Sequence, residues 1–113
     1  MGAKSRRKGA VGERELAGEF SKLFGVEARR GCQYHGGEES PDIRHEIAGV
    51  HVECKRTESL SLYPAMQQAV RDAGENVPIV CHRRNGKPWL AVVRLDDLPR
   101  LAELIYLTMA ENA

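Results

Sequence analysis

Three residues suited to metal-dependent chemistry lie close together near the middle of the chain. Asp42 follows Pro41, and Glu53 and Lys55 stand one residue apart a short way further on. Carboxylate oxygens are ligands that Mg²⁺ and Mn²⁺ prefer, and such an ion polarises a phosphoryl oxygen and lowers the pKa of its bound water. A lysine beside the ion would orient that water and offset charge growing on the phosphate. These residues therefore predict phosphodiester hydrolysis.

Two predicted strands would bring these residues together. The segments 42–47 and 50–55 are joined by a connection short enough for a two-residue hairpin. In that register Asp42 would lie opposite Lys55, with Glu53 as a diagonal neighbour. Because side chains alternate between the faces of a strand, one face would be apolar and the other charged and solvent-exposed. A slip of one residue would separate Asp42 from Glu53.

A fourth carboxylate, Glu13, lies in a predicted helix over residues 11–24. Apolar residues such as Leu16 and Phe20 recur there at helical spacing, and Gly25 follows where a helix would stop. Glu13 stands at the end of this apolar stripe, which would turn its side chain toward the sheet. The alternative is an acidic residue in a first helical turn, where the helix dipole favours negative charge.

The remaining segments predict a sheet with helices packed on it. A short strand over 27–30 precedes a polar, glycine-rich loop over 31–40, and Pro78 indicates the start or the edge of a later strand. Further on, the expected elements are a helix over 62–73, strands over 77–82 and 89–94 around Asn85-Gly86, and a last helix to about residue 109. We predict a single α/β or α+β domain with a central mixed β-sheet flanked by helices. Residues 1–8 would form a basic tail and 9–113 the folded domain.

Charge and cysteine usage restrict the setting of this chemistry. The chain has 113 residues, with 17 Lys plus Arg against 16 Asp plus Glu, but the basic residues cluster near the N-terminus, at 29–30 and at 83–87. Such clusters suit nucleic-acid phosphates, although a solvated tail is the alternative for residues 1–8. Three dispersed cysteines favour neither a disulfide framework nor a zinc site, and predict a reducing cytoplasm. The sequence predicts no membrane-spanning segment and no signal peptide.

Several short motifs together resemble a known group of nucleases. Pro41-Asp42 followed by Glu53-Cys54-Lys55 resembles the motif of the PD-(D/E)XK nuclease superfamily. Other segments make the chain similar to archaeal and phage Holliday junction resolvases over about residues 6–94, namely Arg7-Lys8-Gly9, Gly12-Glu13-Arg14-Glu15-Leu16, Arg29-Arg30-Gly31 and Gln67-Gln68. Archaeal members usually carry a small hydroxyl residue soon after the arginine-glycine segment. Here Cys32 and Gln33 follow, and Ser40 is the alternative hydroxyl.

The resemblance implies a restriction-endonuclease-like fold and a homodimer that binds four-way DNA junctions by shape. Two Mg²⁺-dependent sites, in which Mn²⁺ would substitute, would make paired nicks without any small-molecule cofactor. The implied catalytic residues are Glu13, Asp42, Glu53 and Lys55. The implied metal ligands are Glu13, Asp42, Glu53 and the backbone carbonyl of Cys54. The implied DNA contacts are Arg6, Arg7, Lys8, Arg29, Arg30 and Arg56, and Gln67 would approach the site from its helix.

Other readings of the sequence stay open. A related nuclease could act on flaps, mismatches or ordinary duplex, a non-catalytic protein could bind DNA through the same fold, and a structural module could carry these motifs by chance. The histidines form no ligand cluster in the sequence and predict local hydrogen bonding, and only His51 shares the face of Glu53. The last helix is apolar around much of its circumference, which favours either a dimer contact or burial in a small core.

Overall fold

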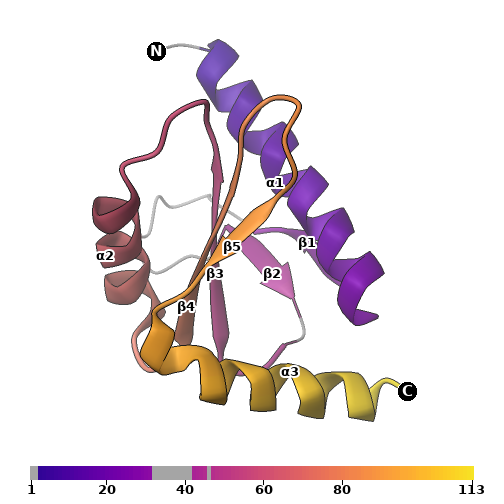
Figure 1. The fold of residues 1–113 in the computed structure, drawn as a ribbon. Coiled ribbons are helices and arrows are strands. Elements are labelled where there is room, and N and C mark those ends of the chain that lie inside the picture. Colours follow the sequence, from indigo (N-terminus) through magenta and orange to yellow (C-terminus); the bar gives the residue numbers. More distant parts are fainter. Residues whose placement is uncertain (1–2, 32–41, 46) are drawn as a thin grey trace.

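A computed structural model of the protein describes residues 3–31, 42–45 and 47–113, with the backbone alone described for residues 3–8. Figure 1 shows a mixed α/β arrangement, which confirms the predicted fold class. Along the chain the elements are α1 (Ala3–Phe24), β1 (Ala28–Arg30), β2 (Ile43–His45), β3 (Val50–Arg56), α2 (Leu62–Ala73), β4 (Val77–Arg83), β5 (Leu90–Val92), the 3-10 turn η1 (Leu95–Asp97) and α3 (Leu98–Glu111).

The described strands form two separate ladders. In the larger one, β3 pairs in parallel with β4 from Val50↔Val77 to Arg56↔Arg83, and β5 pairs antiparallel with the other side of β4. Parallel neighbours need a crossover connection, and α2 provides it here. The smaller ladder is an antiparallel pair of β1 and β2, in which Arg29 lies opposite Arg44.

The predicted hairpin between residues 42–47 and 50–55 is wrong, because β2 pairs with β1 instead of β3. The backbone at the connection explains the difference. A two-residue hairpin turn needs a positive φ at its first central residue, here Ala48. No non-glycine among the described residues has a positive φ, so at this connection Gly49 alone has one, at 81°. That combination suits a type II turn, which splays the flanking strands, so β2 does not continue into a ladder with β3.

The helices cover both faces of the larger sheet (Figure 1). Leu16 and Phe20 of α1 pack on one face against Val52, and Leu101 of α3 joins the same cluster. On the other face, α2 packs its small apolar residues against Val80. The prediction of a solvent-exposed charged face is therefore wrong, because α2 covers the face that carries His51 and Glu53, which are only 5% and 3% exposed.

The element boundaries follow the sequence signals closely in the second half of the chain. Helix α2 has the predicted bounds, and Gly74 ends it with a φ of 59°. Strand β4 starts at Val77, one residue before Pro78. Of the two predictions for Pro78, the start or the edge of a strand, the structure confirms the start. Because β5 pairs only with residues 80–82, the missing N–H of Pro78 removes no bond to β5. The β4–β5 loop is longer than the two-residue turn predicted there.

The terminal helices differ from prediction in extent and burial. Helix α1 begins at Ala3, well before the predicted start at residue 11. In α3 the expected apolar stripe is buried at Leu101 and half-buried at its next turn, but Leu98 is 44% exposed. Tyr106 and Met109 are exposed as well, so this helix presents an uncovered apolar surface. None of the helices in the described part of the chain has the length and apolar composition needed to cross a bilayer.

A glycine in α1 sets how closely this helix approaches β3. A Cβ atom built at Gly12 would stand 2.5 Å from Cβ and 2.8 Å from Cγ of Arg56. Atoms cannot approach so closely, and Cβ of Arg56 is fixed by the strand backbone. A residue without a side chain is therefore required here, one position before Glu13, if the helix is to bring Glu13 next to the sheet.

We expect Gly12→Ala to lower the free energy of unfolding by about 1–3 kcal/mol, because the added methyl group forces α1 away from β3. Gly18→Ala is the matched control, since nothing lies within 4 Å of a Cβ atom at Gly18. In an exposed helix interior that change stabilises a protein by up to about 1 kcal/mol. Urea unfolding of both variants measures the difference, and equal stability of the two would contradict the close approach.

Candidate active site

Asp42 is fixed beside β3 by a hydrogen bond from the main chain. The N–H of Cys54 donates to Oδ2 of Asp42 over 2.7 Å, at the edge of β3 that faces away from β4. A second main-chain bond, from Gly31 N–H to the carbonyl of Asp42, continues the β1–β2 ladder. Asp42 therefore links the smaller ladder to the larger sheet, although no strand pairing joins the two.

Glu53 lies on β3 beneath α2. Its Oε1 is hydrogen-bonded to Nε2 of His51 over 2.8 Å, and both side chains are almost fully buried. Burial raises the pKa of Glu53 above its ordinary value, and the nearby Asp42 carboxylate raises it further, while the bond to His51 lowers it. The dominant influence is desolvation, so this carboxyl holds its proton more strongly than a free glutamate does.

Glu13 reaches the same region from α1. Its side chain is only 12% exposed, and its Oε1 accepts a hydrogen bond from Nε of Arg30 over 2.6 Å. Burial is the main cause that raises the pKa of Glu13, with Arg30 acting in the opposite direction and Asp42 adding to the increase. Because Asp42 raises the pKa of both glutamates, the structure brings the three predicted carboxylates into one electrostatic cluster.

Lys55 follows along β3 and contacts α2. Its Nζ donates to Oε1 of Gln68 over 3.4 Å, a long hydrogen bond. Gln67, which the resemblance placed near the site, is exposed, and the described contact comes from its neighbour Gln68. Within the described part of the chain Lys55 forms no ion pair.

The residues predicted to contact DNA occupy several different environments. Arg29 is exposed, whereas Arg30 is bound to Glu13. Arg56 donates to the carbonyl of Arg83 and to Oδ1 of Asn85, so it also anchors the loop between β4 and β5. The backbone of residues 6–8 is helical within α1, and their side chains are not described. Cys32, Gln33 and Ser40 lie outside the described residues, as does the rest of segment 32–41.

The sequence reading missed two groups of side chains around the cluster. Glu15 had no role assigned from the sequence, but its Oε1 accepts hydrogen bonds from Arg83 and from Nε1 of Trp89, which ties α1 to β4 and to the segment before β5. Asp72 of α2 lies close to His51 and Glu53. The i, i+2 spacing of His51 and Glu53 signalled a shared face, and Asp72 stands at helical spacing from buried Ala69, but only the packing of α2 brings them together.

The described histidines make hydrogen bonds to neighbouring groups, as predicted. His45 accepts a hydrogen bond from the N–H of Ile47, and Nε2 of His82 is bonded to the carbonyl of Thr57. Burial lowers the pKa of His45, and His51 nearby adds to this. His35 lies outside the described residues. Of the described histidines, only His51 contacts one of the predicted catalytic carboxylates.

The class of fold to which this arrangement belongs is known from solved structures. A mixed sheet with helices on both faces is shared with a structural neighbour. That neighbour is Hjc of Archaeoglobus fulgidus, a Holliday junction resolvase from an archaeal hyperthermophile. The likeness has a TM-score of 0.54 at 24% sequence identity and covers 76% of this chain and 72% of the other. The chain matches no protein-family profile and no curated protein sequence.

The raised pKa of Glu53 predicts a stability difference that grows with pH. Above the ordinary value of 4.5 the unfolded chain releases this proton while the folded protein retains it, so the folded state binds more protons and its stability falls as the pH rises. Glu53→Gln removes this loss. We expect the variant to match the wild type in acid and to exceed it in stability increasingly through the window above pH 4.5.

Urea unfolding in EDTA at a series of pH values measures this difference. Comparing the two proteins cancels the titration of groups they share, such as His45. Glu103→Gln, an exposed substitution on α3, is the matched control and should give a difference that does not change with pH. A flat difference for Glu53→Gln would contradict burial of an ionisable carboxyl at this position.

Proposed function

We propose that this protein is an Mg²⁺-dependent, structure-specific DNA endonuclease that resolves four-way junctions by paired phosphodiester hydrolysis. The observation that carries the proposal is the grouping of Glu13, Asp42 and Glu53 with Lys55 around one strand, in a fold shared with an archaeal Holliday junction resolvase. A chance occurrence of these motifs would not require residues from α1, β2 and β3 to converge.

The donor set fits a hard divalent cation. Burial and mutual proximity raise the pKa of Glu13 and Glu53, and a cation between the carboxylates would remove the repulsion that contributes to this. Glu13, Asp42, Glu53 and the carbonyl of Cys54 are the proposed ligands, with Mn²⁺ able to replace Mg²⁺. The N–H and C=O of one strand residue point to the same edge, so the Cys54 carbonyl lies on the Asp42 side. When bound, the ion supplies an activated water and a polarised phosphoryl oxygen.

The side chains of this chain would supply the remaining parts of the reaction. The Lys55 ammonium offsets the negative charge that develops on the phosphate, and its bond to Gln68 directs it along the sheet edge. Arg30 holds the Glu13 carboxylate in place. The bond from Cys54 keeps Oδ2 of Asp42 turned toward β3.

DNA binding is assigned to the basic residues around this edge, namely Arg6, Arg7, Lys8, Arg29, Arg30 and Arg56. Arg29 is exposed next to Arg30, which is itself bound to Glu13, so a phosphate held there would lie beside the carboxylates. Arg56 would contribute charge while fixing the neighbouring loop. A bare domain of this size offers few side chains for reading base edges, which favours recognition of junction shape.

A homodimer would place two such sites on one junction. Helix α3 offers a surface for it, because Leu98, Tyr106, Leu107 and Met109 are all more than 40% exposed. Apolar groups of this size grouped on one helix favour association with another copy of the same surface. Two sites related by a twofold axis would then nick two strands of a four-way junction.

The decisive test is cleavage of a labelled four-way DNA junction beside a linear duplex of matched sequence. With Mg²⁺ we expect paired nicks in the junction alone, and none with EDTA. Asp42→Asn should lower the cleavage rate by more than about 100-fold, since even groups that only orient a metal ligand change activity by 10–100-fold. Asp96→Asn, an exposed change on η1, is the matched control and should cut normally.

The other outcomes of this experiment assign the protein differently. Equal cutting of junction and duplex would make it a general or flap-type nuclease. Tight junction binding without any cutting by the wild type would identify a non-catalytic DNA-binding protein. Cutting that persists in EDTA would contradict the metal site.

Salt dependence of junction binding tests the proposed DNA surface. Each phosphate contact that is neutralised contributes a slope of about −0.9 to the logarithm of the affinity against the logarithm of salt concentration. Arg29→Ala should therefore make the slope shallower by about 1 unit and weaken binding of all sequences equally. Arg100→Ala, which removes an arginine from α3, is the control, and an unchanged slope in Arg29→Ala would exclude this residue from the interface.

A further inference from the structure

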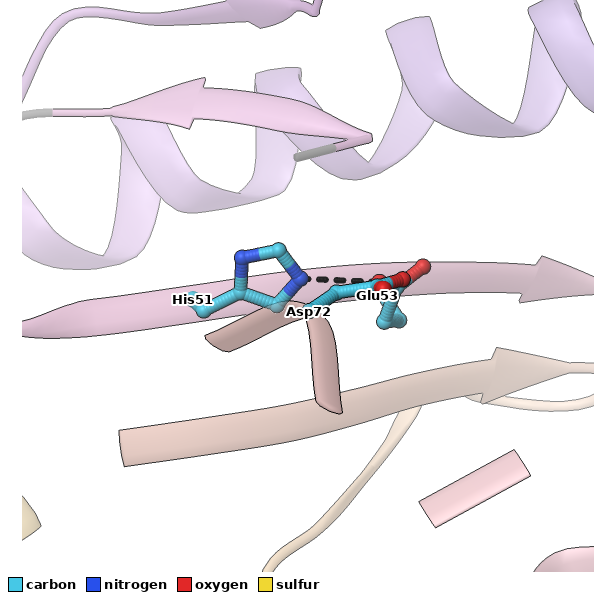
Figure 2. A group of neighbouring side chains, drawn as sticks. All are labelled: His51, Glu53 and Asp72. Carbon is cyan, nitrogen blue, oxygen red and sulfur yellow. Dashed lines mark hydrogen bonds and ion pairs between the residues drawn. The ribbon is translucent and has the colours of Figure 1, made fainter. Parts of the chain in front are cut away.

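A second group of metal-ligating side chains lies between β3 and α2 (Figure 2). His51 and Glu53 project from β3, and Asp72 reaches toward them from α2. One ligand atom from each of the three residues lies within 4.8 Å of the other two. The closest pair, Nε2 of His51 and Oε1 of Glu53, is 2.8 Å apart. These residues converge from two elements on one point.

Only one of the two carboxylates in this group has a hydrogen-bonded partner among the described residues. Glu53 is hydrogen-bonded to His51, and Asp72 forms no hydrogen bond or ion pair within the described part of the chain. Asp72 is half-buried and the other two side chains are buried. Two carboxylates close to one imidazole, one of them buried, repel each other unless a cation joins them.

We propose that His51, Glu53 and Asp72 bind a first-row divalent transition-metal ion, with Zn²⁺ as the type ion. Zinc lies about 2.0–2.2 Å from nitrogen and oxygen ligands in tetrahedral geometry, which places two ligands roughly 3.4 Å apart. The two atoms of His51 and Glu53 need to separate only slightly to reach this spacing. Three protein ligands would leave the fourth position open to water, as in zinc sites that exchange ligands.

The ligand types separate this site from the proposed Mg²⁺ site. Mg²⁺ is bound by oxygen ligands and water, whereas imidazole favours zinc, cobalt and their neighbours. An ion can reach the group through an open groove of about 970 Å³, which His51 and Asp72 both line. Of the three proposed ligands, only Glu53 also belongs to the carboxylate cluster, and its two oxygens allow it to serve two ions. That last link rests on the proposed function, but the site itself does not.

Direct binding of Zn²⁺ and Co²⁺ to the full chain, without DNA, tests the site. We expect calorimetry to give one tight Zn²⁺ site, which Asp72→Asn and His51→Gln weaken by at least about 100-fold. The matched controls, Asp96→Asn and His82→Gln, should bind as the wild type does. Circular dichroism and melting of the metal-free variants show whether each is folded. Asp72→Asn alone remains decisive if His51→Gln unfolds, because Asp72 is only half-buried.

The Co²⁺ form identifies the ligands. Bound at this site, Co²⁺ should give a paramagnetically shifted imidazole N–H resonance that disappears in His51→Gln and persists in Asp42→Asn. A strong sulfur-to-cobalt charge-transfer band would place the ion on a cysteine and overturn the assignment. So would an affinity that Asp72→Asn leaves unchanged. Burial raises the pKa of Cys81 to about 12 and raises that of Cys54, which opposes thiolate binding at these two residues.

These outcomes separate this inference from the proposed function. Junction cleavage that depends on Mg²⁺ and Asp42, in a protein that binds neither Zn²⁺ nor Co²⁺ tightly, would overturn the second metal site alone. Tight Co²⁺ binding that depends on His51 and Asp72, in a protein that cuts no DNA, would support this site and overturn the proposed function.

Discussion

The hydrogen bond from the Cys54 N–H to the Asp42 carboxylate is the contact on which the geometry of the site depends. Strand β2 is paired with β1, and no ladder joins that pair to the larger sheet. Asp42 lies just before β2, whose Ile43 packs in the same core cluster as Val52, and the bond adds a direct link from Asp42 to the strand that carries Glu53. At 2.7 Å the bond has the short length typical of a charged acceptor, and such bonds are about twice as strong as neutral ones. One side chain thus joins two sheets and belongs to the site.

Burial of Glu53 destabilises the folded protein when this carboxyl is ionised. A carboxylate beneath a helix loses hydration, and the imidazole of His51 recovers only part of that loss. Packing explains why the position is tolerated. The small residues Ala65 and Ala69 allow α2 to lie close to the sheet, and they present no competing charge. The folded protein therefore holds an acidic group that gains from any cation bound beside it, and stability and metal affinity are linked through the same residue.

The sequence allowed the elements and their order to be predicted, but not how the strands pair. The helical spacing of apolar residues and the end signals predicted both ends of α2 correctly. Pro64 and Gly74 act on the backbone next to them, so their effect can be predicted from the sequence. Pairing depends on backbone angles at a turn, and Ala48-Gly49 carries a hairpin-like spacing with the wrong pattern of φ. Alternation along β3 correctly placed His51 with Glu53. This alternation does not predict which face of the sheet a helix covers, because an amphipathic helix such as α2 can pack on either face.

The same limit applies to the candidate site. Glu13, Asp42 and Glu53 were found from motifs and helical spacing, and the structure places them close enough to influence one another. Asp72 has no such local signal, because its relation to His51 arises only when the crossover helix packs on the parallel strands. Contacts of this kind depend on tertiary structure, and a pattern of period 2 or 3.6 carries no information about them.

Helix α1 connects the proposed DNA-binding and catalytic parts mechanically. Arg7 and Glu13 lie on one continuous helix, so at 1.5 Å per residue they stand about 9 Å apart along its axis. Further along, Leu16 and Phe20 are buried in the core, and Gly12 allows the helix to rest against Arg56 of β3. If Arg7 binds DNA as proposed, this rigid helix would hold that contact at a set distance from Glu13. The bond from Arg30 to Glu13 and the contact of Gly12 with Arg56 then keep this carboxylate against the sheet.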